Sequence, residues 1–573
     1  MFLKLSLIIF VLISFAFSEP MKKVYFAGNK ILSKDYLYTN LNIAIDKAWY
    51  DFSKDKTPKI GSIVIKPLEK TLINLYKSEG FYNIKVKTKS KKNDITFFIK
   101  EGAPIKIKSV EIKSNLSIKK FIKFKRGDRF IVSKFINSRK NIKKELHDRG
   151  YCNYDLTTKA YVDIKKYQVK LLYELQKNKK CFFGKIVINS PKNMPKKVIA
   201  SRLSYKENDI YSPAKIDRSY KNILGLDAYD SVNIKESNFG DKIDTEISVT
   251  PKKATTVKNI GVGYETQYGF KALLHWEKKN FLGGAKKIAF DLKYSKDDKY
   301  LKNTFFYPAL FKMKFWNKYF DFKNEFAYED TVYDNFKEKK VVDIVHFQKD
   351  LYNYSIDFGI DFENIKITKD IDYYLINDGA FNLVSPFVKF IMDKRDSKID
   401  PRQGYYLSSY LESGLTNLGS SSSYLKMLAE GRVIKTVNRF TIAFKTRFGL
   451  IEEFEKDLPE SKLFFAGGSF SNRAYGYNKL GATNAQYSGL GGKTMIDSSL
   501  EIAHPIVGKV SFALFVDSTM LSVKEADFSS DFVNSYGFGI RYKTIIGPIK
   551  LDFGVNAKDS SIYAFHFQIG QSF

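Results

Sequence analysis

The segment closest to a motif for chemistry is GLGGKT, residues 489–494, which imitates a phosphate-binding loop. That loop follows the pattern G-x-x-x-x-G-K-[ST], which would require glycine at position 487, where this chain has Tyr487. The residues that follow alternate like a strand, so no helix N-terminus is expected to hold a phosphate. We therefore expect no nucleotide at this segment.

The other residue types that could catalyse a reaction or bind a metal are scattered along the chain. None of the histidines has the spacing of a metal-ligand set; they are His147, His275, His346, His504 and His566. We also find no set of a nucleophile, a base and a residue that orients the base. The sequence predicts a protein that is not an enzyme and that uses no metal and no cofactor.

A glycine-rich stretch with a single arginine, FFAGGSFSNRAYGYNKLG, spans residues 464–481 between segments that alternate like strands. One interpretation is an ordinary surface loop with a solvated Arg473. The other is a loop that buries Arg473, and a buried arginine needs acceptors to offset its desolvation. The composition of the stretch fits both, and the choice depends on the elements that flank it.

The first 18 residues predict export from the cytoplasm. A short basic start, Met1 to Lys4, precedes an apolar run from Leu5 to Phe17, and Ala16-Phe17-Ser18 has the small-x-small pattern of a cleavage site. We expect a signal peptide at residues 1–18 and a mature chain that starts near Glu19. No later stretch has about 18 apolar residues without charge, so a place in a membrane would require a barrel.

The chain is strongly basic, with a formal net charge of +33. Such a charge can indicate nucleic acid, anionic lipid or acidic partners. It can equally reflect a compositional bias toward lysine, because the lysines are scattered and no dense basic tract stands out. We favour the compositional interpretation and expect no nucleic-acid partner.

Residues 19–253 predict three copies of one unit, with the order strand, helix, helix, strand, strand. The copies are expected at 19–104, 105–180 and 181–253. The long helix of each copy stops near Gly80, Gly150 and Leu226, which are 70 and 76 residues apart. Repeats at such a nearly fixed period indicate one structural unit used three times.

The two cysteines, Cys152 and Cys181, belong to the second copy. A disulfide is permitted in an exported chain. Cys152 starts the second strand of that copy, and Cys181 lies just past the end of the third. Those two ends meet in an antiparallel hairpin, so a short bridge across it is possible. Two buried free thiols are the alternative.

From residue 254 to 573 helical periodicity disappears, and roughly sixteen alternating segments follow. In YAFHFQIGQSF (563–573) one face carries aromatic and aliphatic side chains and the other face is polar or small. A soluble sandwich also alternates. Three features favour a transmembrane barrel instead: an apolar face rich in Phe and Tyr, a mixed polar face, and segments near the about 9–11 residues of a tilted strand.

Several motifs occur in an order typical of a known family. The repeats contain LYKSEGFYNIKV and LHDRGYCNYDL. The barrel contains DKRDSKIDPRQGYYL (393–407), FFAGGSFSNRAYGYNKLG (464–481), GFGIRYKTIIGPIKLDFG (537–554) and FHFQIGQSF (565–573). Over nearly the whole mature chain the sequence resembles the POTRA–barrel outer-membrane assembly factors. Three repeats and the GPIKLD strand most resemble the TamA branch, the outer-membrane subunit of the translocation and assembly module. The five-repeat BamA branch comes second, and the two-repeat secretion transporters match less well.

The resemblance implies three α/β POTRA repeats in the periplasm, followed by a 16-stranded antiparallel transmembrane β-barrel in the outer membrane of a Gram-negative bacterium. It also implies that residues 464–493 form an inward-folded extracellular loop that places Arg473 in the lumen. The family pattern is Arg-Gly-aromatic, and this chain has Arg473-Ala474-Tyr475. The alanine departs from the pattern, and Gly476 is a candidate to share the tight turn.

The expected acceptor for Arg473 is Asp517. Alternation places Asp517 on the polar face of GKVSFALFVD, and Phe515-Val516-Asp517 matches the F-x-D-x-G strand of the family, with Ser518-Thr519 in place of its end. Glu501, on the polar face of DSSLEIAHP, is the second candidate. We predict that a charge-assisted Arg473–Asp517 pair pins the loop.

A barrel is closed where its first strand meets its last. We expect this seam between 257–266, which contains Gly261 and Gly263, and 562–573, which contains Gln568, Gly570 and Phe573. Glycine weakens a strand, so Gly570 favours a seam that opens sideways and offers its edge to a client strand.

The resemblance implies a factor that inserts or exports β-rich clients, either unfolded barrels or autotransporter-like proteins. The implied partners are a TamB-like protein anchored in the inner membrane and docked on the POTRA repeats, and outer-membrane lipid or lipopolysaccharide. Three alternatives stay open: a passive channel, a BamA-type general insertase and a two-partner-secretion transporter. Lipid is an alternative cargo.

Overall fold

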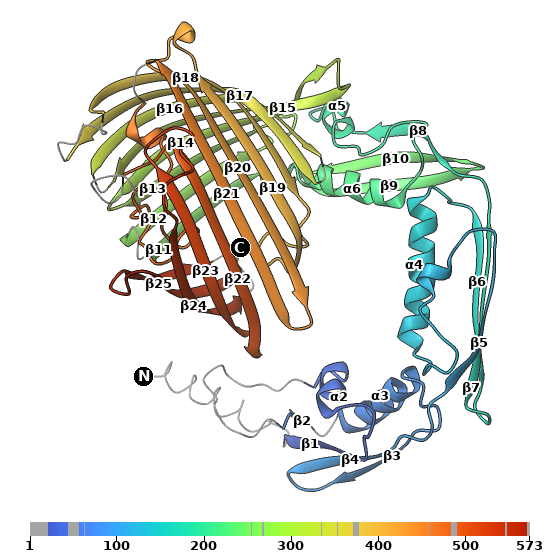
Figure 1. The fold of residues 1–573 in the computed structure, drawn as a ribbon. Coiled ribbons are helices and arrows are strands. Elements are labelled where there is room, and N and C mark those ends of the chain that lie inside the picture. The colour runs from blue at the N-terminus through green and yellow to red at the C-terminus, as the bar shows by residue number, and fades with distance from the viewer. Residues whose placement is uncertain are drawn as a thin grey trace, which may run out of the picture. The chain divides into compact units, whose positions relative to one another are not determined.

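The computed structural model of this 573-residue chain describes residues 21–43, 57–61, 64–253, 255–265, 269–333, 335–351, 353–370, 377–455, 458–482, 490–544 and 547–569. The predicted signal peptide, 1–18, lies outside these ranges, as do Gly570 and Phe573 of the predicted seam. Three small α/β repeats come first and a 16-stranded antiparallel sheet follows (Figure 1). The predicted fold class is therefore confirmed.

Each repeat has the predicted order of elements. The first contains β1 (Lys22–Ala27), α2 (Lys34–Asn40), a short extra strand β2 (Lys59–Ile60), α3 (Ile65–Ser78), β3 (Lys85–Ser90) and β4 (Asp94–Lys100). The second contains β5 (Lys106–Ser114), the 3-10 helix η2 (Lys119–Phe121), α4 (Val132–Asp148), β6 (Tyr154–Asp163) and β7 (Gln168–Lys177). The third contains β8 (Phe182–Asn189), α5 (Lys196–Ala200), α6 (Pro213–Leu224), β9 (Tyr229–Phe239) and β10 (Lys242–Pro251).

The long helix of each repeat is amphipathic and buries one face. The buried positions recur every three or four residues, as one helix face requires: Leu68, Leu72 and Tyr76 on α3, Ser138, Ile142 and Leu146 on α4, and Ile216, Ser219 and Ile223 on α6. In the first two repeats these faces and the apolar sides of the sheets share one core each. The sheet orders are β2-β1-β4-β3, β5-β7-β6 and β8-β10-β9.

A glycine ends the long helix in the first two repeats. Gly80 and Gly150 have left-handed φ values of 92° and 85°, which an L side chain rarely adopts. Their carbonyl oxygens then accept the N–H groups of Ile105 and Cys181, each at 2.8 Å, at the start of the next repeat. In the third repeat Asp227 takes the left-handed conformation, with φ 53°.

Cys152 and Cys181 form a disulfide, with Cα atoms 5.8 Å apart. Cys152 precedes β6 and Cys181 follows β7. These two strands form an antiparallel hairpin in which Tyr154 pairs with Lys177 at that end. The structure therefore has the bridged form of the two alternatives left open by the sequence.

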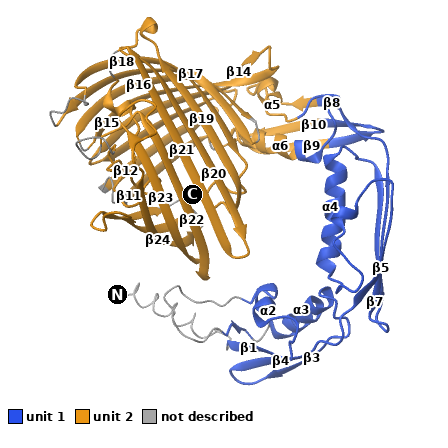
Figure 2. Ribbon diagram, in the orientation of Figure 1, with its two compact units in different colours: residues 1–186, 205–215, 236–245 blue, residues 187–204, 216–235, 246–573 orange. Residues whose placement is uncertain are grey.

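The chain forms two compact units (Figure 2). The first consists of residues 1–186, 205–215 and 236–245, and the second consists of residues 187–204, 216–235 and 246–573. The second unit therefore contains part of the third repeat together with the barrel. Within it, Arg202 and Asp321 form a buried ion pair, with 2.8 Å between Nη2 and Oδ2. The barrel strand next to that of Asp321 contains a bulge. At this bulge the backbone N–H of Ala309 donates to Oδ1 of the same carboxylate, at 2.8 Å.

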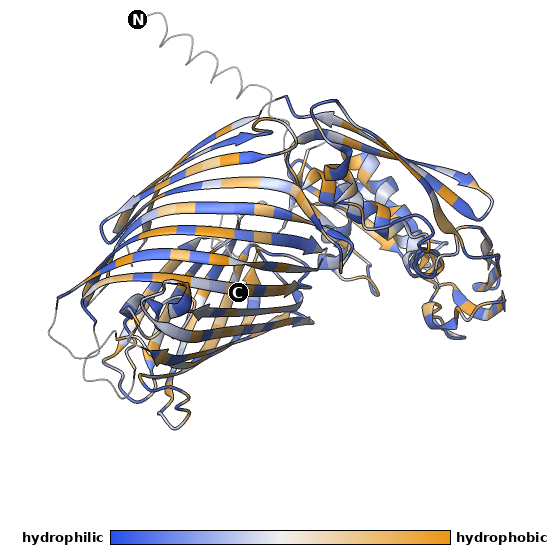
Figure 3. Cartoon of the chain, turned by 90° about the horizontal axis from the view of Figure 1, so that it is seen from above, coloured by the Kyte–Doolittle hydropathy of each residue, from blue (hydrophilic) through white to orange (hydrophobic). Residues whose placement is uncertain are grey.

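The barrel strands are β11 (Thr256–Glu265), β12 (Gly269–Lys279), β13 (Lys287–Ser295), β14 (Asp298–Met313), β15 (Lys318–Val332), β16 (Phe336–Leu351), β17 (Tyr354–Lys369), β18 (Gly379–Asp393), β19 (Gln403–Gly414), β20 (Ser423–Val437), β21 (Phe440–Glu455), β22 (Thr494–Val507), β23 (Val510–Ser522), β24 (Val533–Thr544), β25 (Gly547–Asn556) and β26 (Tyr563–Ile569). Each pairs with the next along the chain. Polar and apolar segments alternate along them (Figure 3), which gives an apolar outer face and a polar lumen.

The sheet order begins at β11 and ends at β26. No ladder joins these two strands among the described residues, so closure of the barrel by this pair stays a prediction. The outward side chains of β11 are unusually exposed, 82% for Ile260 and 76% for Val262, compared with 56% for Leu514 inside the sheet. Side chains of a strand that has no neighbour on one side are exposed in this way.

Within the described part of the chain, no helix is both long enough and apolar enough to cross a membrane.

Candidate functional site in the barrel lumen

The connection between β21 and β22 folds back into the barrel. After η4 (Glu460–Lys462), Phe464 and Gly492 exchange two backbone hydrogen bonds of 2.8 Å, and Leu480 N–H donates to the carbonyl of Ala466 at 3.1 Å. Gly467 and Gly468 turn the chain with φ values of 99° and 103°. The glycine-rich composition therefore serves a loop that pairs with itself inside the lumen.

An apolar cluster holds this loop against the inner barrel wall. The loop contributes Phe464, Ala466, Leu480, Ala482 and Leu490, and the wall contributes Phe336, Ile365, Ile367, Leu383, Tyr424, Ile451, Met495 and Leu521. All of them are buried, although the lumen face is otherwise polar. Removal of this surface from water favours the inward position.

The structure brings Arg473 and Asp517 together. The guanidinium donates from Nε and Nη2 to the two carboxylate oxygens of Asp517, at 2.9 and 2.8 Å, and the backbone N–H of Arg473 donates to Oδ2 at 2.9 Å. Ser499 Oγ bridges the pair, and the Phe515 ring lies 3.4 Å from Cζ. Arg473 is 3% exposed and Asp517 is fully buried. This bidentate geometry is the strongest form of such a pair.

Glu501 is also a partner, and it extends the site to a second arginine. Its Oε2 accepts from Arg473 Nη1 at 2.7 Å and from Arg541 Nη2 at 2.9 Å. Arg541 in turn pairs with Asp552. Lys550, buried on the same wall, interacts electrostatically with Glu501 and Asp552. Three cations thus balance three carboxylates, which a buried network requires.

The Ala474 that departs from the family pattern fits this loop. Ala474 is buried and is not among the described residues with positive φ, so no glycine is needed there. Gly476 also lacks a positive φ, and the left-handed turns lie at Gly467 and Gly468. Tyr475 accepts a hydrogen bond from Asn556 Nδ2 at 2.8 Å.

Gly554 on the inner face of β25 makes room for the loop, and Gly537 of β24 makes room for the Phe515 ring of β23 that lies against Arg473. A Cβ atom on Gly554 would lie 2.3 Å from the carbonyl oxygen of Arg473, and one on Gly537 would lie 2.4 Å from the Phe515 ring. His566 of β26 reaches the same carbonyl, with Nε2 at 3.1 Å. The last strands of the barrel are therefore shaped around the Arg473 backbone.

A Gly554→Ala variant should lower the free energy of unfolding by about 1–3 kcal/mol, because the new methyl group displaces the loop. Urea unfolding in detergent, followed by tryptophan fluorescence, measures the change. The matched control is Gly431→Ala on β20, where the nearest atom to an added Cβ is 4.0 Å away. Equal free energies of unfolding for the two variants would mean that the close approach of the Arg473 carbonyl to Gly554 does not affect stability.

Lys462 anchors the base of the loop on the opposite strands. Its Nζ pairs with Glu412 at 2.8 Å and also with Glu363. Lys426 Nζ donates to the carbonyl of Lys462 at 2.7 Å. The loop is therefore fixed at two points, by Lys462 to β17 and β19 and by Arg473 to β22 and β23.

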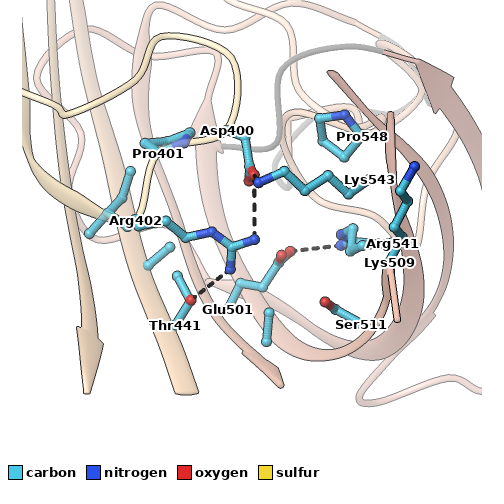
Figure 4. A pocket seen from close by; sticks show the side chains of 13 residues that line it. Asp400, Pro401, Arg402, Thr441, Glu501, Lys509, Ser511, Arg541, Lys543 and Pro548 are labelled. Carbon is cyan, nitrogen blue, oxygen red and sulfur yellow. Dashed lines mark hydrogen bonds and ion pairs between the residues drawn. The ribbon is translucent and has the colours of Figure 1, made fainter. Parts of the chain in front are cut away.

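Glu501 and Arg541 also line a small cavity of about 60 Å³ at the end of the lumen where the chain turns from β22 to β23 (Figure 4). Its rim carries Arg402, Lys509 and Lys543. Asp400 pairs with Lys543 at 3.0 Å and with Arg402 at 3.4 Å. The arginine network thus faces a basic opening of the barrel.

Sequence reasoning named Arg473, Asp517, Glu501 and Tyr475 but did not identify Arg541, Asp552, Gly554 or Lys462. Arg541, Asp552 and Gly554 occupy polar or small positions of the alternating segments 535–543 and 547–555, and that signal could have added them to the site. Lys462 carried no comparable signal. Among the described residues, no three His, Cys, Asp or Glu side chains are grouped as a metal site would require.

Comparisons with known proteins agree with this architecture. The family model for the Omp85 superfamily domain matches residues 280–573. The outer membrane protein assembly factor BamA of Buchnera aphidicola subsp. Acyrthosiphon pisum (strain APS) is 22% identical over 322 residues, which cover 53% of this chain and 52% of that protein. BamA of Neorickettsia risticii (strain Illinois) is 23% identical over 233 residues, which cover 39% of this chain and 31% of that protein. The chain thus matches about half or less of the length of these relatives.

Among solved structures, the crystal structure of BamA from Haemophilus ducreyi lacking POTRA domains 1–3 is similar to this chain. The TM-score is 0.55 at 17% identity, and the alignment covers 82% of this chain and 100% of that one. At this identity the likeness supports the fold alone.

Proposed function

Because this chain belongs to the Omp85 superfamily, whose members are outer-membrane proteins with periplasmic POTRA domains, we propose that it inserts or exports β-rich client proteins at the outer membrane. Omp85 membership also gives its location, the outer membrane of a Gram-negative bacterium with the POTRA repeats in the periplasm.

The observation that carries this proposal is the lumen loop together with the two edge strands. The loop is fixed inside the lumen by the Arg473 and Lys462 pairs, which argues against a simple open channel. β11 and β26 lie at the two ends of the sheet order. A strand edge with unsatisfied N–H and C=O groups can pair with an incoming strand. The seam is therefore the route that we propose for clients.

The three repeats support a docking role in the periplasm. Their outermost strands β3, β6 and β9 each lie at one edge of a sheet, and such edges accept extended chains by strand addition. We propose that these edges bind a TamB-like partner anchored in the inner membrane, and that the clients are autotransporter-like. A BamA-type general insertase is the second candidate, since the curated relatives carry that name.

Reconstitution tests the proposed function. Proteoliposomes that contain the chain should fold an added unfolded barrel client faster than empty liposomes of the same lipids, with folding followed by the heat-modifiable shift on gels. Equal rates with and without the chain would contradict an insertase. Recovery of either a TamB-like protein or lipoproteins from solubilised membranes then separates the two candidates.

A further inference from the structure

The second repeat contains an unusually basic segment. Residues 119–149, from η2 to the end of α4, contain twelve Lys or Arg and only three Asp or Glu. This segment is an exception to the otherwise scattered lysines of the chain. Four of these cations, Lys120, Lys123, Lys134 and Lys144, line one groove of the repeat.

This groove runs between η2 and α4, within the first compact unit. Its volume is about 640 Å³, which is in the usual range for ligand sites. Phe121 and Phe124 form an apolar floor, and both are half-buried. Exposed lysines surround the floor: Lys120, Lys123, Lys134 and Lys144.

These lysines are only partly balanced. Lys120 pairs with Glu145 at 3.0 Å, and Arg149 shares that carboxylate at 2.7 Å. Asp148 is the other acid of the groove. Lys123, Lys134 and Lys144 make no ion pair or side-chain hydrogen bond with the described residues. A concave surface with unbalanced cations attracts anions.

The polar groups of the groove suit a peptide. Asn137 and Asn141 lie one turn apart on α4 and both line the groove. A primary amide both donates and accepts, so the pair can hydrogen-bond to consecutive backbone groups of an extended chain. The two phenylalanine rings offer an apolar contact between the cations. No strand residue lines the groove, so binding here would not use a sheet edge.

We propose that this groove binds an acidic peptide segment of a partner protein, with carboxylates on Lys123, Lys134 and Lys144 and an apolar side chain on Phe121 and Phe124. The inference goes beyond the proposed function, because it does not depend on the seam or on the client. Under this proposal, the basic side chains of the second repeat bind the acidic segment of a partner.

Binding of a labelled peptide to the full-length chain in detergent tests the proposal. The probe is a fluorescein-labelled peptide of sequence SDFEDFEDS, and SKFRKFRKS is the charge-reversed counterpart. The groove variant is Lys123→Glu with Lys134→Glu. The matched control is Lys125→Glu with Lys140→Glu, which makes the same change in net charge on the same loop and helix outside the groove.

The acidic peptide should bind the unmodified chain and the control variant, and the groove variant should bind it about tenfold more weakly or worse. The counterpart peptide should not bind. An equal loss in both variants would mean general electrostatic attraction and would overturn the proposal. Loss of phosphatidylglycerol vesicle binding in the groove variant, without peptide binding to the unmodified chain, would assign the groove to lipid and also overturn it.

Discussion

An Arg473→Met variant should release the inward loop, and its free energy of unfolding is expected to fall by about 3–5 kcal/mol. Arg473 makes its hydrogen bonds with Asp517, Glu501 and Ser499, all buried. Methionine keeps much of the side-chain volume but leaves the carboxylate of Asp517 buried without its cation. The cost is the desolvation of that charge.

Urea unfolding in detergent measures this effect, and limited proteolysis reports whether the loop becomes accessible. The matched control is Arg402→Met, since that arginine pairs with Asp400 at a site where its side chain is 43% exposed. The control should change stability by less than about 1 kcal/mol. An Arg473→Met protein as stable as the control would show that the network does not hold the loop.

The double variant Arg473→Met with Asp517→Asn should be more stable than Arg473→Met alone. Asparagine removes the uncompensated charge that the single variant leaves in the lumen, while Arg541 still balances Glu501. The free energies of unfolding of Arg473→Met, of Asp517→Asn and of the double variant, measured under the same conditions, test this. Simple additivity of the two substitutions would contradict a direct interaction between Arg473 and Asp517.

The repeated α/β units and the sixteen strands could be predicted from the sequence because both carry local signals. Neighbouring residues are sufficient to predict the helix ends at Gly80 and Gly150 and the alternation in β26. The hairpin between β6 and β7 likewise brought Cys152 and Cys181 within reach of each other. Short-range periodicity is sufficient for such features.

The composition of the lumen site could be predicted only in part. Alternation showed that Asp517 and Glu501 face the polar side, but it gave no information on which strands surround the loop. The contacts of Arg541 and Asp552 depend on strand order around the barrel, and the role of Gly554 depends on how closely the loop approaches β25. Lys462 reaches Glu412 across fifty residues of sequence. These are long-range packing properties, for which one sequence contains no local signal.

The second large effect concerns the seam. If clients enter between β11 and β26, a covalent bond between these strands should reduce client assembly to the level without the protein. Gly261 lies in β11 and Gln568 lies in β26, the strands at the two ends of the sheet. Neighbouring positions would cover an error in register. The alternation within β26 places Gln568 on the lumen side with His566.

The most direct measurement is therefore client assembly with Gly261→Cys and Gln568→Cys combined in a chain that lacks Cys152 and Cys181. The same background without the two new cysteines is the control and must still assemble clients. We expect assembly to stop when the new bridge is oxidised and to resume when it is reduced. If the bridge forms completely and assembly continues at the control rate, the seam is not the route. Cargo would then pass through the lumen or along the POTRA repeats.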